Sequence, residues 1–205
     1  MGHERSTGGG RIDTPEDTTP DEVLMRRFQR GDARAFPELV RRHRAAVFAF
    51  VLRWTQDRAR AEDILQETWL KVVRASADWS PRARFTTWLY TIARNACVDG
   101  ARRERARATE PLEAEPVSTE GVDPERAAAA AELRPVLEAA IAALPEAQRE
   151  VFLLREMAGI PFQEIARMTG APEPTVKSRM RYALESLRGR LTEAGIDAPA
   201  GGQVA

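Results

Sequence analysis

The stretch of this sequence best suited to contacting another molecule is ARFTTWLYTIARNACVDGARR, at residues 83–103. It gathers three aromatic side chains, Phe85, Trp88 and Tyr90, and then turns polar and basic at Arg94 and Asn95. Aromatic rings stack on unpaired bases, an asparagine amide both donates to and accepts from a base edge, and arginines bind phosphates. The stretch therefore fits a surface for nucleic acid, and its apolar spacing fits a buried helix equally well.

Groups that catalyse reactions or bind metals do not gather in the sequence. His3 lies near the start and His43 in an arginine-rich segment, and no glycine-rich phosphate loop or nucleophile elbow is present. The single cysteine, Cys97, excludes an internal disulfide and a cysteine-rich zinc site. We therefore expect no catalytic residue, no metal and no cofactor. Cys97 stands between Ala96 and Val98 and is expected to be an inert buried thiol rather than a redox-sensitive one.

Charge is segregated along the chain although it cancels overall. The 31 basic and 31 acidic side chains give a net charge of zero, so a nucleic-acid partner has to be bound by local clusters. Residues 82–107 hold seven arginines against two acids, and residues 110–126 hold six acids against one arginine. The basic cluster overlaps the aromatic stretch, which favours nucleic acid as its partner.

Helices are the elements that must position these groups, because strand-like alternation is absent from the sequence. Residues 21–55 predict two helices separated by a break at Gly31 and Asp32. RAEDILQETWLKVVRAS, at residues 60–76, predicts an amphipathic helix with an acidic outer face. A loop with a Ser-Pro pair follows, and Phe85 begins a further helix whose apolar stripe includes Leu89 and Ile92.

The fold class predicted is all-α, with two helical domains joined by a flexible acidic linker. The predicted order is a disordered tail at 1–19, a first domain at 20–107, the linker at 108–127, a second domain at 128–192 and a disordered tail at 193–205. No apolar run approaches the roughly 20 residues that span a bilayer, and residues 1–20 lack the apolar core of a signal peptide. We therefore expect a cytoplasmic protein without membrane insertion.

The second domain carries the pattern of a helix-turn-helix in IPFQEIARMTGAPEPTVKSRMRYALESLRGRL, at residues 160–191. A short helix ends at a turn containing Gly170, and a longer helix follows with an apolar stripe that includes Val176 and Met180. Lys177 and Arg181 lie on its other side, near the helix start, where a recognition helix enters the major groove. An ordinary amphipathic helix with a solvated basic face fits the same pattern.

Taken together, the two halves resemble the extracytoplasmic-function (ECF) sigma factors of bacterial RNA polymerase, over nearly all of residues 21–192. RAEDILQETWLKV is similar to the family's region 2 helix that binds the clamp helices of the largest polymerase subunit. ARFTTWLYTIARNACVDGARR is similar to its promoter-melting and minus-10 segment, and PFQEIARMTGAPEPTVKSRMRYALESLR to its region 4, which reads the minus-35 element.

The resemblance implies three sets of binding residues. The set for core polymerase is Asp63, Gln66 and Glu67. The set for minus-10 DNA is Arg82, Arg84, Phe85, Arg94, Asn95, Asp99, Arg102 and Arg103. The set for minus-35 DNA is Thr175, Lys177, Ser178, Arg179, Arg181 and Tyr182. The implied partners are core RNA polymerase, including its flap region for the second domain, promoter DNA in duplex and melted form, and an anti-sigma factor. The loop at residues 79–85 is implied to receive a flipped base.

The residues themselves leave simpler alternatives open at this point. Asp63, Gln66 and Glu67 also fit a solvated helix face, Asn95 a side chain bonded to its own backbone, and Arg82 a solvated loop. Two other protein classes share some of these features. One is a helix-turn-helix regulator that acts without polymerase, and the other is a recombinase or transposase, which needs a nucleophilic serine or a set of metal-binding carboxylates.

Three positions depart from the usual family pattern. Pro161 replaces a helix-capping serine or threonine, and Pro174 replaces a common glycine, yet both suit a first helical turn. Gly100 stands where a larger residue is usual, which predicts a looser helix end or a close approach of DNA.

Overall fold

The computed structural model describes residues 19–82, 84–107 and 124–196, and this part of the chain contains eight α-helices and no strand. Most of the predicted tails and of the predicted linker lies outside the described residues, and α8 includes Glu193, the first residue of the range predicted as the second tail. Within them the all-α prediction is confirmed. Helix α5 begins at Pro124, inside the range predicted as linker.

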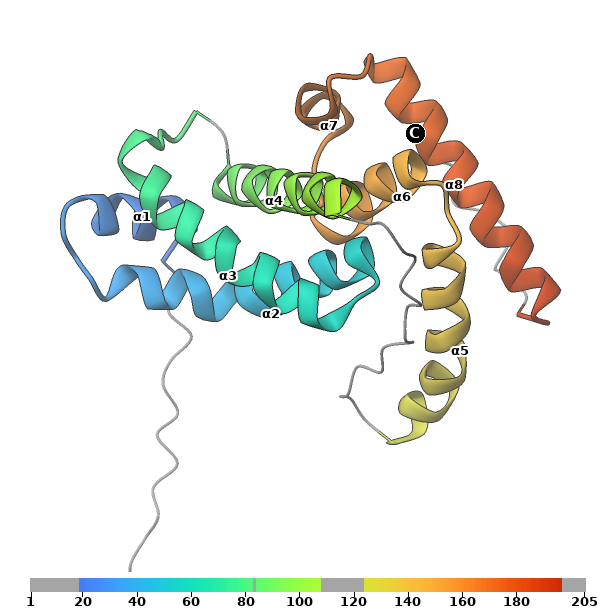
Figure 1. Ribbon diagram of the computed structural model, residues 1–205. Helices are drawn as coiled ribbons and strands as arrows, with labels where there is room; N and C mark the ends of the chain where they lie inside the picture. Colours follow the sequence, from blue (N-terminus) through green and yellow to red (C-terminus); the bar gives the residue numbers. More distant parts are fainter. Residues whose placement is uncertain (1–18, 83, 108–123, 197–205) are drawn as a thin grey trace, which may run out of the picture.

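Four helices form the first domain (Figure 1): α1 (Asp21–Gln29), α2 (Ala35–Thr55), α3 (Arg58–Ala75) and α4 (Phe85–Arg107). A short 3-10 helix, η1 (Ser76–Asp78), continues α3 towards the loop before α4. The chain turns between α1 and α2 at Gly31, whose φ of 93° is easily reached only without a Cβ. Asp57 caps α3 by accepting a hydrogen bond from the Arg60 amide at 3.1 Å.

The second domain contains α5 (Pro124–Ala142), α6 (Glu146–Phe152), α7 (Phe162–Thr169) and α8 (Glu173–Glu193). Helix α6 runs on into a π-helical segment, η2 (Leu153–Met157). Pro145, Pro161 and Pro172 each occupy the N-cap position of the helix that follows. Gly170, with φ 67°, ends α7 and makes the predicted turn before α8. Pro161 precedes α7 and Pro174 lies in the first turn of α8, so both departures are accommodated at helix starts, as expected.

The core follows the predicted helical stripes. Phe50 of α2 is fully buried and meets Tyr90 of α4 edge to face, with ring centroids 5.2 Å apart. Ile64 and Leu65 bury the inner face of α3, and Leu89 does the same for α4. A Cβ added at Gly100 would lie 3.2 Å from the Ile64 Cδ1 atom, so the missing side chain lets α3 approach α4 closely. The looser helix end and the close approach of DNA stay predictions.

The two domains pack against each other. Helix α6 lies beside α4, and α5 and η2 contact α2 (Figure 1). This packing brings part of the second domain onto the helix that holds the predicted minus-10 residues.

Candidate nucleic-acid and polymerase interface

The predicted core-binding residues lie on the outward face of α3. Asp63 and Gln66 are exposed, and the intervening Ile64 and Leu65 point into the core. Leu70 continues the same outward face and is 56% exposed, an unusual environment for a leucine. The face therefore offers a carboxylate, an amide and an apolar group to a partner.

Glu67, the third predicted core-binding residue, is already engaged within the domain. Its carboxylate accepts from Lys71 at 2.9 Å and from Arg103 of α4 at 2.7 Å. Lys71 also contacts Asp99 of α4 at 3.2 Å. Partial burial raises the pKa of the Glu67 carboxyl, but the hydrogen bonds from Lys71 and Arg103 outweigh it and hold this pKa below the usual value. The cluster links the predicted polymerase face of α3 to the predicted DNA residues of α4.

The loop before α4 carries Arg82 and Arg84, both exposed, and residue 83 between them lies outside the description. Trp79, at the start of this loop, is buried at 5% exposure, and its ring lies 6.4 Å from that of Trp88. The Trp79 indole N–H has no hydrogen-bond partner among the described residues. The loop thus combines two exposed cations with two aromatic rings, one buried at its start and one partly buried in α4.

Phe85 differs from its predicted role as a direct DNA contact. Its side chain is 0% exposed and packs against Trp88 and His43, with ring centroids 6.0 and 5.5 Å away. The apolar stripe of α4 decides its orientation, because Leu89 and Ala96 lie on the same buried face. Phe85 therefore fixes the start of α4 and offers no surface to DNA in this arrangement.

The remaining predicted minus-10 residues of α4 fall into two groups. Four of them are exposed along one side of the helix: Asn95, Asp99, Arg102 and Arg103. Arg94 is different, because its side chain is only 19% exposed and donates to Glu150 of α6 at 2.7 Å. Arg94 also donates to the Asn95 amide oxygen at 3.3 Å. The structure thus places four of these five residues on one exposed side of α4, while the second domain covers Arg94.

Two further ion pairs join the domains with the same polarity as the pair of Arg94 and Glu150. Arg105 of α4 meets Glu146 of α6 at 2.8 Å, and Arg53 of α2 pairs with Glu138 of α5. In every one of these pairs the first domain supplies the arginine and the second the glutamate. The glutamates therefore pair with arginines that suit DNA phosphates, and nothing in the sequence indicates this pairing.

The predicted minus-35 residues lie together on the N-terminal half of α8. Five are exposed and Arg179 is half-buried; the exposed ones are Thr175, Lys177, Ser178, Arg181 and Tyr182. Lys177 contacts Glu173 at 2.8 Å, and the Arg181 guanidinium lies 4.8 Å from the centroid of the Tyr182 ring. Val176, Met180, Ala183 and Leu187 bury the opposite face, as the sequence predicts. The surface is basic and aromatic, and no other described helix covers it.

Cys97 is buried at 1% exposure in α4. Burial raises the pKa of its thiol to about 12, and the nearby charge of Arg94 offsets only part of that effect. A thiol with this pKa holds almost no reactive thiolate at neutral pH, which agrees with the expected inert role.

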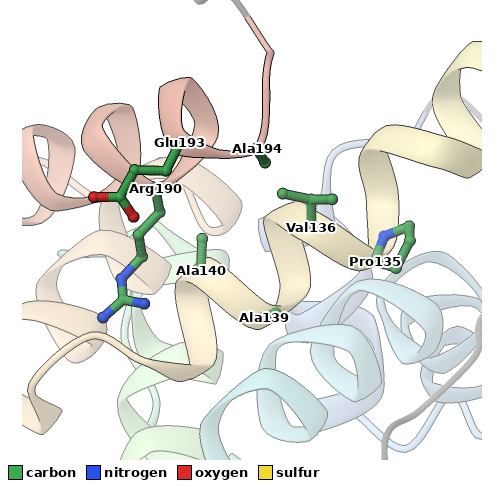
Figure 2. Close-up of a pocket in the computed structure, with 7 residues that line it drawn as sticks. All are labelled: Pro135, Val136, Ala139, Ala140, Arg190, Glu193 and Ala194. Carbon is green, nitrogen blue, oxygen red and sulfur yellow. The ribbon is translucent and has the colours of Figure 1, made fainter.

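The rest of the described structure contains a notable cavity and neither a metal site nor a membrane-spanning helix. A cavity of about 530 Å³ lies between α5 and the C-terminal end of α8 (Figure 2), away from the predicted binding residues. Its lining residues are Pro135, Val136, Ala139, Ala140, Arg190, Glu193 and Ala194. Among residues 19–82, 84–107 and 124–196, no three His, Cys, Asp or Glu side chains are placed to hold a metal ion, and no helix is long and apolar enough to cross a bilayer.

Comparison with known proteins matches both domains separately. Residues 39–107 match the family model for Sigma-70 region 2, and residues 135–187 match that for Sigma-70 region 4. The chain belongs to the ECF sigma factors. It is 34% identical to the ECF RNA polymerase sigma-E factor of Escherichia coli over 82% of this chain and 92% of that protein. It is 33% identical to the RNA polymerase sigma-H factor of Pseudomonas aeruginosa over 82% of this chain and 91% of that one.

Solved structures agree on the fold. CnrH in complex with the cytosolic domain of CnrY matches with a TM-score of 0.62 at 24% identity, over 84% of this sigma factor and 97% of CnrH. RpoE in complex with the anti-sigma factor NepR from Bartonella quintana matches with a TM-score of 0.61 at 23% identity, over 77% and 96% of the two chains. Family membership over both domains supports the sigma-factor prediction rather than a polymerase-independent regulator or a recombinase, and sigma factors are not an enzyme class.

Proposed function

We propose that this sigma factor docks on core RNA polymerase through Asp63, Gln66 and Glu67 of α3 and opens promoters with α4 and the loop before it. The observation that carries the proposal is the placement of three exposed polar faces, on α3, α4 and α8, around buried apolar stripes. Carboxylate and amide groups suit a basic and polar partner helix, and a helix-turn-helix suits the major groove. Purified protein added to bacterial core polymerase should produce promoter-specific transcripts. Failure to associate with core would refute the proposal.

Each DNA-binding group has a proposed role that matches its chemistry. Asn95 and Asp99 would contact minus-10 bases, and Arg102 and Arg103 would contact duplex phosphates and add salt-dependent affinity. Arg82 and Arg84 would hold phosphates beside a base that is flipped into the loop, because unstacking a base requires compensating contacts. Arg94 joins this set only when its pair with Glu150 opens. Both solved relatives are complexes and that of RpoE holds an anti-sigma factor, so the proposal includes one as a partner.

Replacing Asn95 with alanine tests the minus-10 assignment. The amide is exposed, and loss of a bidentate base contact costs about 1–3 kcal/mol, so we expect promoter opening to fall by roughly 5- to 150-fold. Opening is measured by permanganate footprinting of the promoter, and core binding by fluorescence anisotropy of the labelled sigma factor. Core binding should stay unchanged. Equal loss of both activities would indicate a folding defect, and unchanged opening would refute the assignment.

Replacing Lys177 and Arg181 together with alanine tests the minus-35 assignment. Both side chains are exposed on α8, and we expect binding to minus-35 duplexes to weaken by about 1–3 kcal/mol for each base contact that is lost. The measurement compares affinities for promoter and scrambled duplexes at fixed salt. A matched control replaces Arg188 and Arg190, which lie on the C-terminal part of the same helix. Unchanged selectivity in the first variant, or equal loss in both, would contradict the assignment.

A further inference from the structure

Helix α1 contacts both ends of the segment that connects α3 to α4. The Gln29 side-chain amide donates to the backbone carbonyls of Ser76 and Trp79, each at 2.8 Å. Glu22, two turns earlier on α1, accepts a hydrogen bond from the Phe85 backbone amide at 3.0 Å. The two side chains therefore fasten the segment at its start and at its end. Helix α1 lies outside residues 39–107, which match Sigma-70 region 2.

The Glu22 carboxylate provides the N-terminal cap of α4, which the residues just before this helix do not provide. The first amides of a helix have no partner inside it, and a Ser, Thr, Asp or Asn at the N-cap usually accepts from one of them. The residues just before Phe85, at 81–84, read PRAR and include none of these types. A carboxylate at a helix N-terminus also interacts favourably with the helix dipole. Glu22 thus caps α4 from a position 63 residues away in the sequence.

Helix α1 is itself held firmly in place. Asp21, next to Glu22, accepts from His43 at 2.7 Å and from Arg42 at 3.0 Å, and both of these residues belong to α2. Leu24 and Met25, between the two fastening side chains, are buried in the core at 1% and 0% exposure. The carboxylate of Glu22 and the amide of Gln29 therefore start from a rigid support rather than from a loose terminus.

The middle of the fastened segment is left open to a ligand. Ser80, Pro81, Arg82 and Arg84 are exposed between the two attachment points, while Trp79 is buried and its indole N–H is unpaired in the described structure. Neither Glu22 nor Gln29 belongs to this open part. Their hydrogen bonds reach the Trp79 carbonyl and the Phe85 amide, at the two ends of the loop.

We propose that Glu22 and Gln29 are positioning residues, which hold Trp79 and Phe85 at the two ends of the base-accepting loop without touching DNA themselves. The inference rests on the proposed function, because it assigns to the loop the capture of a melted base. A loop that samples many shapes loses part of its binding free energy to ordering, so fastening both ends favours capture.

Four variants of the full chain test the inference: Glu22→Ala, Glu22→Gln, Gln29→Ala and, as a matched control, Val23→Ala at an exposed position of the same helix. Base capture is read from the fluorescence of 2-aminopurine placed in a single-stranded minus-10 oligonucleotide bound to the holoenzyme. We expect Glu22→Ala and Gln29→Ala to weaken capture by about tenfold each, since each loses contacts worth on the order of one strong hydrogen bond. Glu22→Gln keeps an acceptor oxygen and should restore most of the capture, and Val23→Ala should behave as the unaltered chain.

Core binding and amide hydrogen exchange of the free chain separate this inference from the function on which it rests. We expect unchanged core binding in all four variants, and faster exchange at the Phe85 amide in Glu22→Ala alone. Unaltered protein that fails to bind core or capture the base would refute the proposed function. Normal capture by Glu22→Ala and Gln29→Ala would refute the positioning role. Loss of core binding in step with capture, or no rescue by Glu22→Gln, would also refute it, because the contacts would then support the domain as a whole.

Discussion

Replacing Asp63 with arginine should weaken the binding of core RNA polymerase by about 100-fold or more, because a charge reversal at the centre of an interface turns attraction into repulsion worth several kcal/mol. Asp63 is exposed on α3 beside Gln66, and its neighbours Ile64 and Leu65 carry the packing of the helix. The substitution should therefore leave the fold intact. Binding is measured by anisotropy of the labelled sigma factor titrated with core, at two salt concentrations.

The control for this variant is Glu193→Arg, which makes the same charge change at an exposed position at the end of α8. A basic side chain suits a helix C-terminus, so this control should be as stable as the unaltered chain. Thermal unfolding of both variants checks the fold. Equal affinity of the two variants for core would remove Asp63 from the polymerase interface.

Glu67 shows how the two proposed binding faces are connected. It stands in the predicted polymerase set, yet its carboxylate holds Arg103, which stands in the predicted DNA set. A polymerase group that engages Glu67 has to share its carboxylate with Lys71 and Arg103, or replace one of them as its partner. The side chains are about a third to a half exposed, so the exchange costs little free energy.

Periodicity predicted most of the fold, because burial in helices follows local spacing. The apolar positions of α3, α4 and α8 appear in the sequence at three- and four-residue intervals, and the same residues form the core. The helix-turn-helix was readable from Gly170 and from the unequal helix lengths. Family motifs then supplied roles that spacing alone does not carry.

Contacts between distant segments escaped prediction for a physical reason. Arg94 is polar and follows the aromatic cluster, so a DNA contact was the natural interpretation, and nothing near it in the sequence indicates Glu150 as its partner. The cap from Glu22 to α4 and the fit of Gly100 against Ile64 also join segments more than 35 residues apart. The spacing of apolar residues places Phe85 on the buried stripe of α4, whereas the family resemblance assigned it to the minus-10 DNA set.

Changing Glu138, Glu146 and Glu150 together to glutamine should loosen the second domain from α2 and α4 and raise the affinity for a single-stranded minus-10 oligonucleotide. Each change removes the charge that pairs with Arg53, Arg105 or Arg94. Exposed ion pairs contribute about 0.2–1 kcal/mol each, so loss of all three should weaken the closed arrangement by roughly 0.6–3 kcal/mol. That corresponds to about 3- to 150-fold more of the open form.

Domain separation can be followed by energy transfer between dyes on cysteines introduced at Ala45 of α2 and Arg188 of α8, both exposed. The native Cys97 can remain, because it is buried at 1% exposure and its thiol pKa is raised to about 12. The control changes Glu156, Glu164 and Glu193 to glutamine, which alters the net charge equally but away from α4. Added salt should separate the domains of the unaltered chain and of the control, and should have little further effect on the first variant. Unchanged energy transfer together with unchanged oligonucleotide affinity would show that these glutamates do not restrict access to Arg94.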